Sequence, residues 1–174
     1  MTTLLKAGIL TASDRSFQGE RDDQSGLLLK GLAVEIPAEI LVYRVVPDEK
    51  QAIREALLEM VEFFHCDLIL TTGGTGLAPR DVTPEATREI LDREVPGIAE
   101  AIRAAGMRSK PAAMLSRGLA GVRGKCLIIN LPGSPKAVVE SFQVLRPVLK
   151  HAVELMKGAV SDCQALSSSQ YFHS

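Results

Sequence analysis

Four short polar segments of the sequence carry residue types that suit the binding of phosphorylated ligands. They are residues 13–15, 47–49, 72–76 running on to 80–81, and 131–135. Their glycines leave main-chain N–H groups accessible and permit positive φ angles, so such a segment can cradle an anion. Their aspartates can hold Mg²⁺ or orient a polar substrate. The combination favours a site for phosphates over a nucleophile paired with an imidazole.

The glycine cluster Gly73, Gly74 and Gly76 follows neither of the two common phosphate-loop patterns. No Lys-Ser or Lys-Thr pair comes after it, and Pro79 occupies the last place of a G-x-G-x-x-G frame that starts at Gly74. A P-loop and a dinucleotide fingerprint are therefore excluded, and with them an oxidoreductase that uses a dinucleotide. On the glycines alone, a tight turn at a strand end is the favoured interpretation.

Asp48 and Asp81 are the candidate catalytic residues and also the candidate ligands of Mg²⁺, because both come shortly after predicted strands. Asp48 has an alternative role as the N-cap of a helix. Ser134 and Pro135 predict a helix start, which either binds an anion through its free N–H groups or is an ordinary cap. Cations that could balance phosphate charge are Arg15, Arg80, Lys110, Arg117 and Lys136.

The elements that must position these segments are strands alternating with amphipathic helices. Apolar runs predict strands at residues 4–12, 39–46, 66–72 and 125–131. Helix signals follow each strand, including a regular apolar stripe from Ile53 to Phe64 and the pair Thr83-Pro84, in which Thr83 is the predicted N-cap and Pro84 the first helical residue. Two further helices are predicted from 97 toward 107 and from 135 to about 158.

This alternation predicts one Rossmann-like, three-layer α/β domain with a mainly parallel sheet, over residues 1–160. In such a sheet the loops after the strands converge on one edge, so the four polar segments should meet there. Residues 161–174 are small and polar without an apolar stripe, and we expect a disordered tail. The cysteines have no disulfide or metal spacing and are expected to be buried thiols.

Composition limits the classes of partner. With 174 residues and a formal net charge of −1, the chain has no basic field for a nucleic acid. It has no apolar run near the roughly 20 residues that span a bilayer, and its start does not resemble a signal peptide. We therefore expect a cytoplasmic protein with no nucleic-acid or membrane partner.

Six ordered motifs resemble the molybdopterin adenylyltransferase family of the MogA type and the matching G domains of gephyrin and its plant counterpart. The resemblance spans about residues 5–158. The D-x-S-G stretch at residues 23–26 favours the adenylylating branch. The motifs are S-D-R at 13–15, P-D-E at 47–49, T-T-G-G-T-G at 71–76, R-D-V-T-P at 80–84, L-S-R at 115–117 and L-P-G-S-P at 131–135.

This resemblance implies a reaction in which the terminal phosphate of molybdopterin attacks the α-phosphate of ATP and releases pyrophosphate, with Mg²⁺. It also implies a homotrimer and suggests a molybdenum-insertion protein as partner. Asp48 and Asp81 match the functional aspartates. Pterin and ATP contacts are expected at Ser13, Asp14, Arg15, Thr72, Gly73, Gly74, Thr75, Gly76, Ser116, Arg117, Pro132, Gly133, Ser134 and Pro135. The alternative is a MoaB-like or scaffold-type pterin-binding protein without this activity.

Overall fold

The computed structural model of the protein describes residues 4–158. The expected tail at residues 161–174 and Cys163 lie outside the described residues, as do the last two positions of the predicted domain. Cys66 and Cys126 are buried free thiols, as the sequence predicted.

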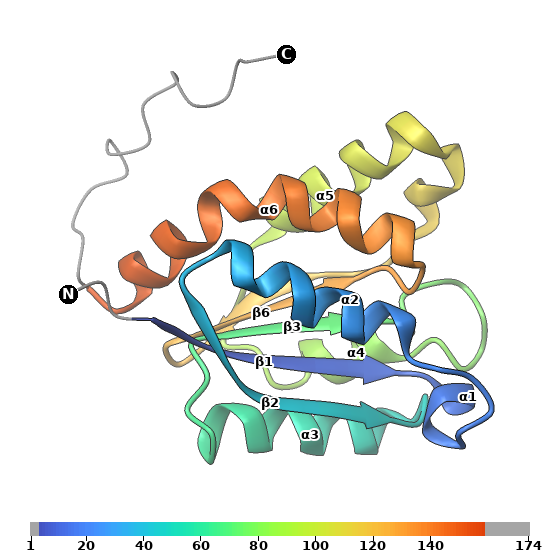
Figure 1. Cartoon of the computed structure of the whole chain (residues 1–174), viewed down its shortest axis with the longest axis horizontal. Helices are drawn as coiled ribbons and strands as arrows, with labels where there is room; N and C mark the ends of the chain where they lie inside the picture. Colours follow the sequence, from blue (N-terminus) through green and yellow to red (C-terminus); the bar gives the residue numbers. More distant parts are fainter. Residues whose placement is uncertain (1–3, 159–174) are drawn as a thin grey trace.

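A six-stranded sheet forms the centre of the molecule, with strand order β2-β1-β3-β6-β5-β4 (Figure 1). The first four strands in this order pair in parallel, and β5 and β4 add an antiparallel edge. The predicted, mainly parallel sheet is therefore confirmed. The strands are β1 (Leu5–Ala12), β2 (Ala38–Val46), β3 (Leu68–Thr72), β4 (Arg93–Glu94), β5 (Ala120–Arg123) and β6 (Cys126–Leu131).

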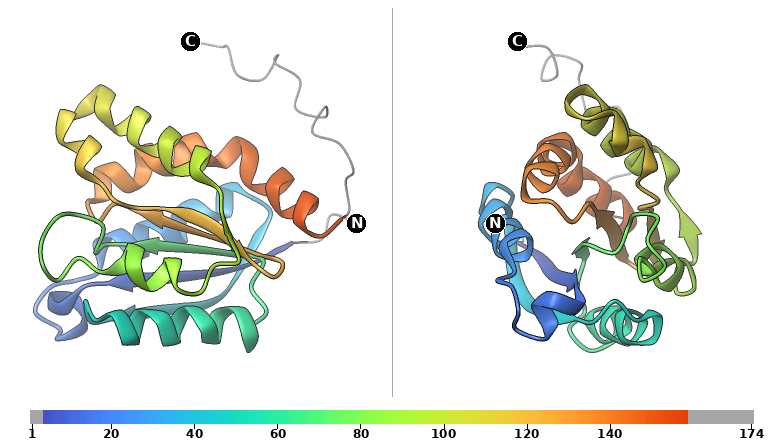
Figure 2. Two further views of the ribbon diagram at one scale, coloured as in Figure 1. Left: turned by 180° about the vertical axis from the view of Figure 1, so that it is seen from behind. Right: turned by 90° about the vertical axis from the view of Figure 1, so that its right-hand side faces the viewer.

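Helices cover both faces of this sheet, which makes the three layers that the sequence predicted. Helices α2, α5 and α6 lie on one face, while α3 and α4 lie on the other, as Figures 1 and 2 show. The helical segments are α1 (Asp14–Phe17), α2 (Gln24–Leu32), η1 (Ala33–Glu35), α3 (Lys50–Glu62), α4 (Thr83–Arg88), α5 (Pro96–Ser109), η2 (Pro111–Leu115) and α6 (Pro135–Met156), where η marks a 3₁₀ helix.

Alternate residues of the central strands enter two separate apolar cores. Leu68 and Leu70 of β3 face α2 and α6, whereas Ile69 faces α3 and α4. A strand that is buried on both faces has a nearly continuous run of apolar residues. The central strands could therefore be predicted from the sequence. Phe142 of α6 is fully buried, as are Ile53 and Leu57 of the predicted stripe in α3.

Several local expectations were wrong. The antiparallel edge of β5 and β4 was not predicted, because two short strands with small and charged residues have no apolar period. Asp48 does not cap α3; the cap residue is Glu49, which makes no side-chain cap bond. Thr83 lies inside α4 and is not its cap. By contrast, the Ser134 hydroxyl caps α6 by accepting from the Ala137 N–H.

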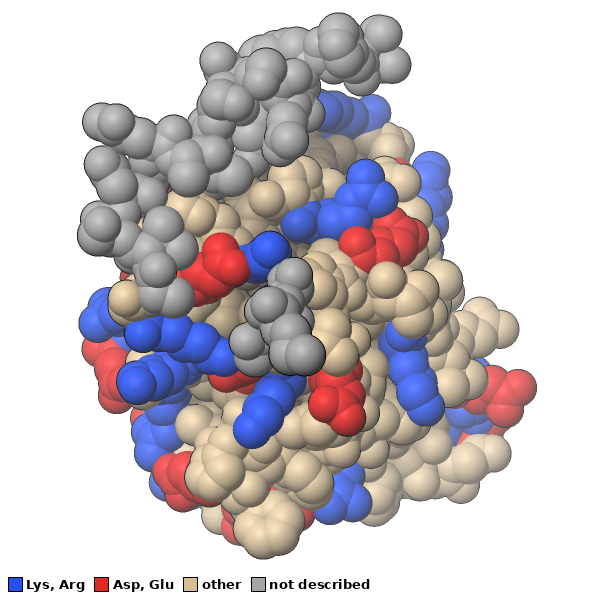
Figure 3. Space-filling model, turned by 60° about the vertical axis from the view of Figure 1, so that its left-hand side comes forward, with Lys and Arg blue, Asp and Glu red and all other residues tan. Residues whose placement is uncertain are grey.

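Charges of both signs are interspersed on the face in Figure 3, without a large field of one sign. This agrees with the formal net charge of −1. Within residues 4–158, no helix has the length and apolar character to cross a bilayer.

The turn between α3 and β3 stores local strain that a mutation can release. Among the described residues, His65 is the one non-glycine residue with a positive φ, at 52°, and it is exposed. A left-handed conformation costs a residue with a β-carbon roughly 1–2 kcal/mol. Glycine avoids this cost but loses about 0.5–1 kcal/mol through its freer unfolded chain.

We expect His65→Gly to raise the free energy of unfolding by up to about 1 kcal/mol, measured by urea denaturation. His65→Ala is the matched control, because it removes the imidazole but keeps the β-carbon and should give no such gain. Destabilisation by the glycine variant would contradict the strain argument.

Candidate functional site

The carboxyl ends of β1, β2, β3 and β6 bring the four polar segments to one edge of the sheet. In Figure 1 the arrowheads of β1, β2 and β3 point to the side where α1 and the start of α6 lie. Two cavities open at this edge, with volumes of about 630 Å³ and 520 Å³. Four residues line both of them: Gly74, Asp81, Gly133 and Ser134. The two cavities therefore meet at the glycine loop.

The larger cavity, here called the loop cavity, lies among the loops after β1, β2 and β3. Of the predicted site residues, Asp48 lines it from the loop after β2, and Pro135 lines it from the start of α6. It is also lined by residues 21–25, which sequence reasoning did not include among the contacts. The remaining predicted residues in this cavity are Ser13, Asp14, Arg15, Thr72 and Gly73.

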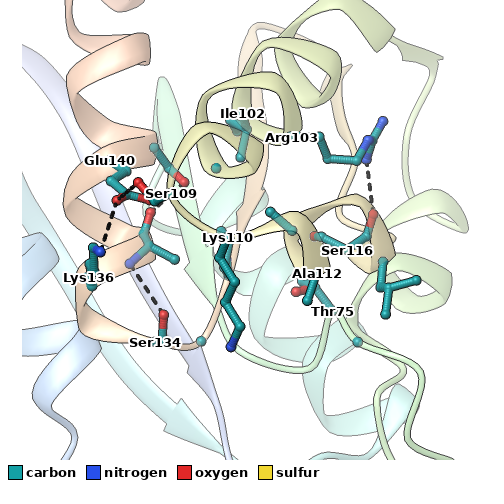
Figure 4. Close-up of a pocket in the computed structure, with 18 of the residues that line it drawn as sticks. Thr75, Ile102, Arg103, Ser109, Lys110, Ala112, Ser116, Ser134, Lys136 and Glu140 are labelled. Atoms are coloured by element: carbon teal, nitrogen blue, oxygen red, sulfur yellow. Dashed lines mark hydrogen bonds and ion pairs between the residues drawn. The ribbon is translucent and has the colours of Figure 1, made fainter.

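The smaller cavity, here called the helix cavity, lies between α5, η2 and the start of α6. Four of the residues expected to contact pterin or ATP line it: Thr75, Gly76, Ser116 and Pro132. Figure 4 shows the Lys110 side chain extending across the space between Ser134 and η2. Arg103, Ser109 and Glu140 line this cavity too, and the sequence did not identify them, because helix positions carry no local signal of a site.

Asp14 and Asp48 fasten the first two loops together. The Asp14 N–H donates to the Asp48 carboxylate at 2.8 Å, and the Asp48 N–H donates to the Asp14 carboxylate at 3.0 Å. Arg80, from the loop after β3, donates two hydrogen bonds to Asp14 at 2.8 and 2.7 Å. The Asp14 carboxylate therefore joins three loops, and both of its oxygens already accept hydrogen bonds from this network.

The protonation behaviour of the two aspartates differs. The hydrogen bond from Arg80 lowers the pKa of Asp14 below its ordinary value. Burial raises the pKa of Asp48, and the charges of Asp14 and Asp81 also raise it, while the Asp14 N–H and the Arg80 charge act in the opposite direction. A cation nearby would therefore favour the charged form of Asp48.

The glycine loop has the features of an anion cradle. Gly73 and Gly74 have φ angles of 90° and 65°. Within residues 4–158, none of the main-chain N–H groups of residues 73–76 donates a hydrogen bond. Four unpaired N–H groups beside the N-terminus of α6 favour a negatively charged ligand. This observation shifts the interpretation of the glycines from a turn alone toward a cradle.

Gly74 also packs too closely for any side chain. A β-carbon there would overlap the hydroxyl of Thr83, which is fully buried in α4 and has no hydrogen-bond partner among the described residues. Replacing Gly74 would therefore damage the packing of α4 as well as the cradle, so such a variant cannot separate the two roles. Gly76 is the cleaner position, because a β-carbon there would meet only the Asp81 carboxylate, at 2.8 Å.

Asp23 anchors the loop that precedes α2. Its carboxylate accepts hydrogen bonds from the hydroxyls of Thr11, at 2.6 Å, and Tyr43, and from the Gly26 N–H at 3.0 Å. The adjacent Ser25 hydroxyl donates to the Gly133 carbonyl at 2.6 Å, and so joins this loop to the start of α6. These bonds hold the wall of the loop cavity against two strands.

Arg117 is the one predicted contact that lines neither cavity. Its guanidinium donates instead to the Gly76 carbonyl, the Asp81 carbonyl and the Glu85 carboxylate. The other fifteen predicted site residues line at least one cavity.

Comparison with known protein families shows which family the chain belongs to. The family model described as "Probable molybdopterin binding domain" matches residues 8–151. The chain belongs to this family. The resemblance seen in the six motifs is thereby confirmed.

Other molybdopterin-binding-domain proteins match over most of the chain. A molybdopterin adenylyltransferase of Helicobacter pylori is 41% identical over 157 residues and 87% of each chain is covered. The crystal structure of the molybdopterin biosynthesis enzyme MoaB from Thermus thermophilus is 54% identical, with a TM-score of 0.84, covering 89% of this chain and 98% of that one. The Mog protein of Mycobacterium ulcerans is 41% identical with a TM-score of 0.82, covering 90% and 99%.

Mg²⁺, which the family resemblance implies, suits this site only together with a ligand. Within residues 4–158, no group of three or more Asp, Glu, His or Cys side chains could hold an ion alone. Asp48 and Asp81 each keep one carboxylate oxygen without a hydrogen bond in the described chain. Mg²⁺ is commonly bound by one or two carboxylates plus substrate phosphates. The pair therefore fits an ion that arrives with a phosphorylated substrate.

We expect Arg80→Gln to raise the pKa of Asp48 further, because the variant removes a positive charge and loosens Asp14, whose N–H donates to Asp48. Carbon-13 NMR titration of the carboxyl group measures this directly. The control is Arg88→Gln, which breaks a comparable ion pair with Glu94 away from the loops and should leave Asp48 unchanged. An unshifted or lowered pKa in the Arg80 variant would show that the network does not act on Asp48.

Proposed function

We propose that this molybdopterin-binding-domain protein transfers AMP from ATP to the terminal phosphate of molybdopterin, in the biosynthesis of the molybdenum cofactor. One observation carries the proposal: two cavities, of about 630 and 520 Å³, meet at an unpaired glycine cradle next to Asp81. A transfer between two phosphorylated ligands needs such a meeting point. The named adenylyltransferase relative adds support.

The chemistry requires alignment and charge stabilisation from the chain. An oxygen of the pterin phosphate forms a bond to the α-phosphorus of ATP, and the bond from that phosphorus to the α–β bridging oxygen breaks, so pyrophosphate leaves with the electron pair. The attacking oxygen is already anionic and needs no general base. Amides aimed at the developing charge and a fixed approach of the two reactants therefore supply the catalysis.

Individual residues take distinct parts in this proposal. The N–H groups of residues 73–76 and the start of α6 bind phosphate oxygens, while Asp48 and Asp81 hold Mg²⁺, which offsets triphosphate charge. Lys110 and Lys136 bring positive charge to the helix cavity. Asp14 and Asp23 keep the loops in place through the bonds described above.

The proposal also includes a cytoplasmic homotrimer that passes its product to a molybdenum-insertion protein. These three statements rest on the family resemblance. Light scattering at micromolar concentration tests the trimer, and a monomer mass would refute it.

Pterin binding without adenylyl transfer is the second candidate function, and the 54% identity to MoaB favours it. The deciding experiment is release of pyrophosphate from ATP by the purified protein, measured with and without molybdopterin. Release that depends on molybdopterin supports the transferase. Binding of molybdopterin by calorimetry without any release supports the second candidate.

We expect Asp81→Ala to lower adenylyl transfer on the order of 10²-fold or more while the protein stays folded, because Asp81 lies where the two cavities meet. Gly76→Ala should cause an intermediate loss with little change in melting temperature, since its new β-carbon displaces only the end of the Asp81 side chain. Gly97→Ala is the matched control, because nothing lies within 4 Å of a β-carbon at that helical position. Normal turnover in folded Asp81→Ala would remove Asp81 from the mechanism.

We expect ATP to bind more tightly with Mg²⁺ than without it, because Asp48 and Asp81 line the loop cavity and a triphosphate bound there is itself negative. Isothermal titration calorimetry with MgCl₂ and with EDTA measures the difference. The advantage should shrink in Asp48→Asn, where one ligand charge is lost. Equal affinity under both conditions would contradict the proposed ion site.

A further inference from the structure

The segment from Thr75 to Asp81 has neither helix nor strand, although it carries Asp81 into the site. Residues 77–80 are exposed, so little apolar packing fixes the path of the chain there. Within the segment, the Asp81 carboxylate accepts from the Ala78 N–H at 3.0 Å, and the Asp81 N–H donates to the Ala78 carbonyl at 2.9 Å. These bonds make a local turn but do not fix that turn relative to the sheet.

Arg80 ties the exposed side of the turn to Asp14, and Arg117 makes the connections that hold its two ends. The Arg117 N–H donates to the Thr75 carbonyl at 2.8 Å, and its Nε donates to the Gly76 carbonyl at 2.8 Å. One terminal nitrogen donates to the Asp81 carbonyl at 2.5 Å, and the other to Glu85 in the first turn of α4. A single side chain thus joins both ends of the segment and the helix that follows it.

A second arginine holds the main chain on either side of Arg117. Arg103 of α5 donates to the carbonyls of Ser116 and Gly118, at 3.3 and 2.9 Å, and Figure 4 shows the first of these bonds. The main chain around Arg117 is therefore also held by α5, which does not depend on the exposed part of the loop. Since Arg103 also lines the helix cavity, this chain of contacts links that cavity to Asp81.

We propose that Arg117 is a positioning residue, which sets the place of Asp81 through the Gly76 and Asp81 carbonyls and does not touch the substrates. The effect on catalysis rests on the proposed function; the effect on the loop does not. The guanidinium is needed because three acceptors in different directions require its fork of donors, which a lysine ammonium on a flexible stem does not reproduce.

The test compares Arg117→Lys with Arg123→Lys. Arg123 makes the same kind of contacts, to the Ile90 carbonyl at 2.9 Å and to Glu62 at 2.7 Å, but its acceptors lie outside both cavities. We expect Arg117→Lys to lower kcat on the order of 10- to 100-fold, since a displacement of about 1 Å in a site can cost this much. The KM for ATP should change by less than about threefold, because the cradle amides and the ligand groups remain.

Rescue separates positioning from general destabilisation. In Arg117→Ala, millimolar guanidinium chloride should restore part of kcat, because a free guanidinium ion can occupy the vacated place, whereas it should not alter the activity of Arg123→Ala. Equal losses in the Arg117 and Arg123 variants would overturn the proposal. So would a loss in Arg117→Lys that matches its unfolded fraction.

Amide hydrogen exchange keeps this inference separate from the proposed function. Exchange of residues 76–81 should be faster in Arg117→Lys and unchanged in Arg123→Lys, whether or not the protein transfers AMP. Unchanged exchange in the Arg117 variant would overturn the positioning role. If Arg117→Lys does not fold, Glu85→Gln replaces it, since it removes one partner of the same guanidinium and should speed the same exchange to a lesser extent.

Discussion

Parallel pairing of β1, β3 and β6 is the constraint on which the site depends. The register places Thr11 level with Thr72, and Thr72 level with Leu131, so these strands end in one row. Because these strands end level with one another, the loops that follow them all lie at the same edge of the sheet. Hydrogen bonds across the row then complete the site, including the one from the Thr72 hydroxyl to the Pro132 carbonyl at 2.7 Å.

Carboxylates dominate this edge, although the proposed ligands are anions. The repulsion between these carboxylates and an anionic ligand is reduced because the carboxylates have different partners. Asp14 is neutralised by Arg80 and serves the scaffold, and Asp23 is held by two hydroxyls and a main-chain N–H. Only Asp48 and Asp81 keep an oxygen free of hydrogen bonds among the described contacts of these four residues. Their mutual repulsion creates a demand for positive charge that a metal ion bound to a nucleotide can meet.

Three arginines of this domain hold the main chain in place. Arg103 and Arg117 donate to carbonyls of segments that lack regular structure, as Arg123 does at the far edge of the sheet. The delocalised guanidinium serves this purpose well, because its donors point in fixed directions and can satisfy several carbonyls at once. Such bonds restrain loop segments that lack the regular main-chain bonding of a helix or strand.

The sequence by itself determined the buried strands, the main helices and the family, because these depend on local apolar period, cap residues and contiguous motifs. Of the sixteen site residues that it predicted, fifteen line a cavity, since glycines and aspartates after strands must meet at one edge of a parallel sheet. It could not assign their roles. Whether Asp48 caps a helix, whether Arg117 faces a ligand and which helix residues complete the second cavity all depend on side chains far apart in the chain. Those contacts exist only after packing has fixed the distance between elements, and the tertiary structure alone decided them.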